Sequence, residues 1–117
     1  MPAGAARYRL TGVGTFEALF RRGKRREGRY LQVVYAPTLA EVGRVGYVIG
    51  RKTLSRAVDR NRVKRMLRHV VQAARPRIEV YDLIVRLKKT CPRSEFRRVA
   101  DEAGFLLASL PVLDPTA

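Results

Sequence analysis

The chain has 117 residues and a mass of 13.3 kDa, which is enough for one domain. Its 25 Lys and Arg residues outnumber 10 Asp and Glu residues, and the net charge of +15 favours a polyanionic partner. One cysteine excludes a disulfide framework and a zinc site built from several cysteines. No apolar run reaches the roughly 20 residues needed to span a bilayer, and no signal-peptide core opens the chain. We therefore predict a soluble, cytoplasmic, nucleic-acid-binding protein with no membrane partner.

The first predicted element is a short helix from an N-cap at Thr15 to Arg22, with Gly23 as its C-terminal stop. Its apolar side chains share one face through i, i+3, i+4 spacing: Phe16, Leu19 and Phe20.

Two runs rich in β-branched and aromatic residues follow, at 29–36 and 44–50, and the loop-like connection predicts an antiparallel pair. Alternation divides the first strand into two faces, with Tyr30, Gln32 and Val34 on one and Leu31, Val33 and Tyr35 on the other. Both sets contain apolar groups, so we expect both faces of the sheet to be covered.

Residues 56–74 are predicted to form a helix, with Ser55 as N-cap and Pro76 preventing its continuation. Apolar residues form one stripe along it: Val63, Leu67, Val70, Val71 and Ala74. The opposite side carries polar and basic residues: Asn61, Arg62, Lys64, Arg65, Arg68 and Gln72.

A strand at 80–87 and a last helix from Ser94 to about Leu110 complete the chain, and the helix turns five residues inward: Phe96, Val99, Ala103, Leu106 and Leu110. The order is α-β-β-α-β-α, which predicts an α+β sandwich with helices on a small sheet. Residues 1–117 form one nucleic-acid-binding domain in this prediction, and 1–6 and 112–117 are expected to be loose tails.

Basic residues concentrate in two segments, 21–29 with net charge +5 and 51–68 with net charge +7. A patch of one sign repels itself unless a partner neutralises it, so these segments favour a surface that follows phosphates over a merely solubilising one. Arginine makes up 20 of the 25 basic residues, and its planar fork binds phosphate oxygens in pairs.

Catalytic groups are not apparent in the chain, and we predict neither a catalytic residue nor a metal site within the protein. The acidic residues are scattered, and the adjacent Asp101 and Glu102 are expected on a solvated helix face. His69 is the only histidine and is expected at the surface, whereas Cys91 is expected to pack as a small residue.

One series of motifs is distinctive because of its combined order and spacing. The strand VGYVIG at 45–50 leads through the basic pair at 51–52 and Ala57-Val58 into RNRVKR at 60–65. Arg9-Leu10 and the phenylalanine-bearing helix come before it, and the strand DLIV at 82–85 comes after. Over residues 7–110 this series resembles the bacterial ribonuclease P protein subunit. The resemblance implies a ribosomal-protein-like sandwich with a left-handed strand–helix–strand crossover through the basic helix, against the usual right-handed preference.

In that family the catalyst is a large RNA subunit, which removes the 5′ leader of precursor tRNA and leaves a 5′ phosphate. The resemblance therefore implies two partners, the catalytic RNA and precursor tRNA, and no obligate protein partner. The cofactor it implies is Mg²⁺, held mainly by the RNA subunit and the substrate.

Carried over to this chain, contact with the RNA subunit is expected at nine residues: Arg51, Lys52, Arg56, Arg60, Asn61, Arg62, Lys64, Arg65 and Arg68. The leader is expected between the first helix and the sheet, at Phe16, Phe20, Tyr30, Gln32 and Val34. Position 34 is often aromatic in relatives and is valine here, so stacking is expected mainly at the two phenylalanines, unless these only pack in the core.

Three other functions remain open from the sequence: a ribosomal protein packed into ribosomal RNA, a self-sufficient metal nuclease, and a DNA-binding regulator. The scattered carboxylates disfavour the nuclease, and the absence of helix-turn-helix spacing before the basic helix disfavours the regulator.

Overall fold

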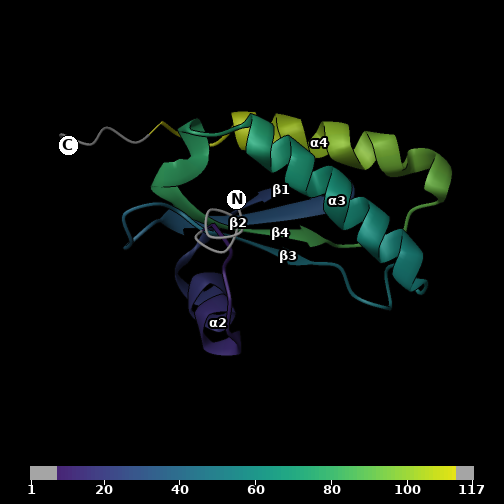
Figure 1. Ribbon diagram of the computed structural model, residues 1–117, viewed down its shortest axis with the longest axis horizontal. Coiled ribbons are helices and arrows are strands. Elements are labelled where there is room, and N and C mark those ends of the chain that lie inside the picture. Colours follow the sequence, from purple (N-terminus) through teal and green to yellow (C-terminus); the bar gives the residue numbers. More distant parts are fainter. Residues whose placement is uncertain (1–7, 113–117) are drawn as a thin grey trace.

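A four-stranded sheet with the order β1-β2-β4-β3 carries helices on both faces in the computed structural model, which describes residues 8–112. Figure 1 shows α3 and α4 side by side over one face and α2 against the other. The elements follow the chain in this order: α2 (Val13–Arg22), β1 (Lys24–Glu27), β2 (Leu31–Pro37), β3 (Val45–Val48), α3 (Ala57–Ala73), the 3₁₀ turn η1 (Arg77–Val80), β4 (Tyr81–Leu87), the 3₁₀ turn η2 (Arg93–Glu95) and α4 (Phe96–Ala108). The α+β class is confirmed. Of the tails predicted at 1–6 and 112–117, only Val112 lies within the described residues, and it is exposed.

The predicted pairing of the 29–36 and 44–50 strands is wrong, because β4 lies between them. β2 pairs with β4 in antiparallel fashion, and β3 pairs with β4 in parallel fashion. The centre of β4 is apolar on both faces, since Leu83, Ile84 and Val85 are all buried, and such a strand belongs in the middle of a sheet covered on both sides. The β3–α3–β4 connection is the expected left-handed crossover.

Strand β1 was missed from the sequence, and the observed order is therefore α-β-β-β-α-β-α. Its four residues, KRRE, include no apolar side chain and lie mostly exposed at the edge of the sheet. They pair with β2 from Lys24 opposite Tyr35 to Glu27 opposite Gln32. Charged side chains protect an exposed sheet edge from pairing with another chain, and they also remove the hydrophobic alternation that would reveal the strand.

The helices have the predicted positions but different N-termini. α2 begins two residues before Thr15, after Gly12, whose φ of 93° is a conformation that favours glycine. α3 follows Arg56 rather than Ser55, and Ser94 lies within η2. The predicted stop at Gly23 is confirmed, since its N–H donates to the Leu19 carbonyl at 2.8 Å.

Two apolar clusters hold the layers together, as the two-faced β2 strand predicted. The larger one joins the sheet to α3 and α4. All five residues predicted to point inward from the last helix are buried in it, although α4 ends at Ala108, before Leu110. In α3, Val63, Leu67 and Val71 are buried, while Val70 and Ala74 are partly buried against the same cluster. The smaller cluster lies under α2 and comprises Leu10, Leu19, Val34, Ala36 and Ile84.

The prediction of a solvated face is right for Asp101 and wrong for its neighbour Glu102. The Glu102 carboxylate accepts the backbone N–H groups of Arg29, Tyr30 and Leu31 at 2.7, 2.9 and 2.7 Å. Three orphan amides at the turn between β1 and β2 are thereby satisfied by one side chain of α4. Glu102 is thus a structural tie between the sheet and the last helix.

Candidate nucleic-acid interface

The basic residues predicted to contact RNA gather along α3 and the loop before it. Asn61, Arg62, Arg65 and Arg68 are exposed on the helix, and Lys64 is half-buried beside them. Arg51, Lys52 and Arg56 are exposed in the loop. Within residues 8–112, none of these cations forms a salt bridge. A rigid helix therefore presents a row of cations that no carboxylate neutralises, which is the arrangement that phosphate contacts require.

Arg60 differs from the other cations of this row. Its guanidinium donates to the carbonyl oxygens of Leu54 and Ser55 at 2.8 and 2.9 Å. These bonds hold the loop against the first turn of α3, where Ser55 supplies no side-chain cap. Arg60 therefore has a structural role at the start of α3, and the outward-facing cations are the candidates for RNA contact.

The face of the sheet that carries α2 contains four of the five predicted leader residues. Phe16 and Phe20 are half-buried against the smaller cluster, so each ring packs in the core and also reaches the surface. Val34 is fully buried beneath α2, which excludes direct contact with a ligand. Gln32 is half-buried, donates to Glu27 at 2.8 Å and accepts from Arg86 at 3.3 Å.

The placement of Tyr30 on the Val34 face is wrong. Its ring is buried in the larger cluster, on the side of α4, and the charged groups of Arg29 and Lys89 lie 5.3 and 5.6 Å from its centre. Tyr30 precedes β2, whose first residue is Leu31, so the alternation of the strand does not apply to it. Of the predicted leader residues, Phe16, Phe20 and Gln32 remain available at the surface.

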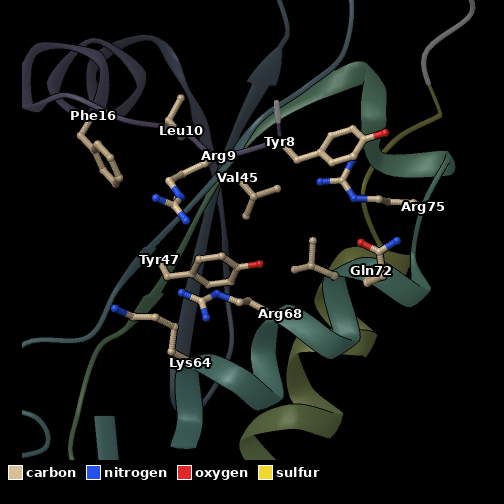
Figure 2. Close-up of a pocket in the computed structure, with 12 residues that line it drawn as sticks. Tyr8, Arg9, Leu10, Phe16, Val45, Tyr47, Lys64, Arg68, Gln72 and Arg75 are labelled. Atoms are coloured by element: carbon tan, nitrogen blue, oxygen red, sulfur yellow. The ribbon is translucent and has the colours of Figure 1, made fainter. Parts of the chain in front are cut away.

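A hollow of about 530 Å³ beside β3 was not predicted (Figure 2). Its walls come from three segments: 8–16, which includes Phe16 of α2; β3; and 64–75, which comprises part of α3 and Arg75 just after it. The lining includes Arg9, Tyr47, Lys64 and Arg68 as well. Tyr47 was assigned only to a strand, and Arg75, just after the helix predicted over 56–74, was given no role. Neither position carries a sequence signal, because the hollow forms where three segments distant in the chain meet.

The remaining reactive groups match their predicted structural positions. His69 is exposed, and Cys91 is buried, where desolvation, with a smaller contribution from Glu95, raises the pKa of its thiol. Among residues 8–112 no three His, Cys, Asp or Glu side chains gather closely enough to hold a metal ion. In the same part of the chain, no helix combines the length and apolar character needed to cross a membrane.

Comparison with known proteins identifies the architecture. The family model described as Ribonuclease P matches residues 5–110, almost the whole chain. The chain belongs to the ribonuclease P protein family. In the structure, the series of motifs that carries the family resemblance forms β3, the loop after it and the first half of α3. The RNR segment thus starts the row of cations described above.

Curated relatives and solved structures agree with this assignment. A ribonuclease P protein component from Acidothermus cellulolyticus is 39% identical over 115 residues, covering 90% of this chain and 89% of that protein. One from Azoarcus sp. is 35% identical over 104 residues and covers 85% of each. The RNase P protein of Staphylococcus aureus has the same fold, with a TM-score of 0.78 at 21% identity over 92% of this chain and 98% of that one. For an RNase P protein from Thermotoga maritima the TM-score is 0.73 at 25% identity, over 88% and 100% of the two chains.

Proposed function

We propose that this chain is the protein subunit of a ribonuclease P, which binds a catalytic RNA subunit and assists removal of the 5′ leader from precursor tRNA. The observation that carries the proposal is the row of unneutralised cations on α3 in a chain of this family. Phosphate contacts made from a rigid helix lose less side-chain entropy than contacts made from a mobile arm. Membership of a two-component enzyme also accounts for the surplus charge of +15.

The bond-breaking groups, in this proposal, belong to the RNA. Hydrolysis of a phosphodiester needs grouped metal ligands or a nucleophile beside a base, and residues 8–112 contain no such metal cluster. The buried Asp82 and the half-buried Glu102 are engaged in structural hydrogen bonds. We propose that Mg²⁺ is held by the RNA subunit and the substrate, and that the product is mature tRNA with a 5′ phosphate.

The leader of the precursor, we propose, lies on the α2 face of the sheet. Phe16 and Phe20 offer ring surface there, and Gln32 with Arg86 offers hydrogen-bond groups and a positive charge. Stacking on aromatic rings tolerates any base, and it contributes about 1–3 kcal/mol per base. Such a surface suits leaders of differing sequence.

Reconstitution tests the proposal directly. The purified protein is added to a bacterial ribonuclease P RNA and a precursor tRNA at an Mg²⁺ concentration where the RNA alone is nearly inactive. We expect a 5′-matured product with a 5′ phosphate, because cations on α3 neutralise RNA phosphates that Mg²⁺ must otherwise screen. The protein without RNA serves as the control. Cleavage by that control, or no stimulation of the RNA, would contradict the proposal.

A further inference from the structure

The hollow beside β3 has the electrostatic character of an anion site. Of the residues that line it, four are cationic and none is acidic: Arg9, Lys64, Arg68 and Arg75. Figure 2 shows these side chains arriving from different segments, with Arg9 before α2 and Lys64 and Arg68 on α3. Its volume of about 530 Å³ falls within the roughly 300–1,000 Å³ typical of sites for small ligands.

Arg75 supplies an independent indication of a ligand. Its side chain is only 9% exposed, and its Nη1 donates to Glu79 at 3.1 Å. The buried Nε finds no hydrogen-bond acceptor among the described residues. Leaving a buried donor unsatisfied costs about 1–3 kcal/mol, so an acceptor brought by a ligand would remove a real penalty. The guanidinium is held in place by the Tyr8 ring, 3.8 Å away, and extends toward the hollow in Figure 2.

Tyr47 provides a surface for a planar group in the same hollow. Its ring is half-buried on β3, and the Arg68 guanidinium lies 5.9 Å from its centre. Burial raises the pKa of Tyr47 to about 12, against the opposing effect of Arg68 and Arg75, so the hydroxyl remains a hydrogen-bond donor at neutral pH. Aromatic rings and guanidinium planes are the groups on which proteins stack unpaired bases.

We propose that the hollow binds one unpaired ribonucleotide, with its phosphate beside Arg68 and Arg75 and its base against Tyr47. The hollow adjoins both proposed RNA surfaces, because Lys64 and Arg68 belong to the row of cations on α3 and Phe16 belongs to α2. The site rests on the proposed function, because RNA is the polyanion that the chain is proposed to bind. The nucleotide comes either from the RNA subunit or from the precursor, and the two sources present the same chemistry.

Titration of the full chain with the dinucleotide uridylyl-uridine, followed by amide NMR, tests the site. We expect shifts at residues 8–10 and 45–47 and along 64–75, and binding about tenfold weaker in Arg75→Met, which loses the charge-assisted hydrogen bonds. Because Arg75 is buried, Lys64→Met at the rim of the hollow is a second variant with the same expected direction. Arg97→Met on α4, whose side chain is 86% exposed and lies outside both proposed RNA surfaces, is the matched control. Shifts that avoid the hollow, or equal weakening in variants and control, would overturn the site.

Cross-linking then identifies the source of the nucleotide. Gln72 is exposed at the hollow, and Cys91 is only 5% exposed, so Gln72→Cys offers the accessible thiol for an azidophenacyl group. In the complex with the RNA subunit and precursor tRNA, a cross-link to either RNA supports the site and identifies which RNA supplies the nucleotide. Attachment to neither, while Arg65→Cys does cross-link, would overturn it. Dinucleotide binding without stimulated processing would instead count against the proposed function alone.

Discussion

At the scale of single residues, Asp101 and Glu102 show how neighbours of the same chemistry take different roles. Replacing Glu102 with Gln removes the charge that three backbone N–H groups share, so we expect a loss of about 1–3 kcal/mol in the free energy of unfolding. Asp101→Asn is the matched control, because that side chain is 75% exposed, and we expect a change within about 0.5 kcal/mol. Urea unfolding of both variants measures the difference. Equal stability would show that the Glu102 contacts do not hold the turn.

The sequence could predict residues whose role follows from periodicity or from a motif. Val63, Leu67 and Val71 in α3 were found in this way, as were the exposed cations Arg62 and Arg65. Roles that depend on a distant segment were missed or misplaced. Glu102 meets a turn more than 70 residues away, Tyr30 packs toward α4, and Arg75 lines a hollow made by three segments. None of these contacts produces a periodic pattern in the sequence.

At the scale of elements, the helices were predicted well because each carries one apolar stripe, whereas the sheet was predicted only in part. Alternation showed that β2 is covered on both faces, but it contains no information about which strand lies beside it. The short connection favoured pairing β2 with β3, and the apolar β4 took that central place instead. Strand β1 could not be predicted because its four charged residues show no hydrophobic alternation, and such residues are suited to the edge of a sheet.

The exposed arginines of helix α3 can be tested as phosphate contacts by mutation. If Arg65 and Arg68 contact phosphates, changing both to Gln should reduce the slope of log binding constant against log salt by about one to two units for the RNA subunit. Arg97→Gln with Arg98→Gln on α4 is the matched control, since both side chains are largely exposed. Filter binding across a salt series measures the slopes. An unchanged slope in the α3 double variant would remove these two residues from the RNA interface.

At the scale of the whole molecule, the two faces of the sheet carry the two surfaces to which the proposed function assigns different tasks. The exposed cations of α3 lie on one side and Phe20 lies with α2 on the other, while Phe16 also lines the hollow beside β3. A protein that held only the RNA subunit would need the first surface alone. In the proposed function, the second surface distinguishes a precursor, which has a leader, from mature tRNA, which has none.

Phe20→Leu tests that division, because leucine keeps apolar contact with the smaller cluster and removes the aromatic ring. In the reconstituted complex we expect precursor tRNA to bind more weakly by up to about 1–3 kcal/mol, the contribution of one stacked base, while mature tRNA binds as before. Phe105→Leu on α4 is the matched control, since its ring is 75% exposed and far from the α2 face. Equilibrium binding of both tRNAs to each complex gives the comparison. An equal loss for precursor and mature tRNA would show that Phe20 supports the fold of the protein and does not contact the leader.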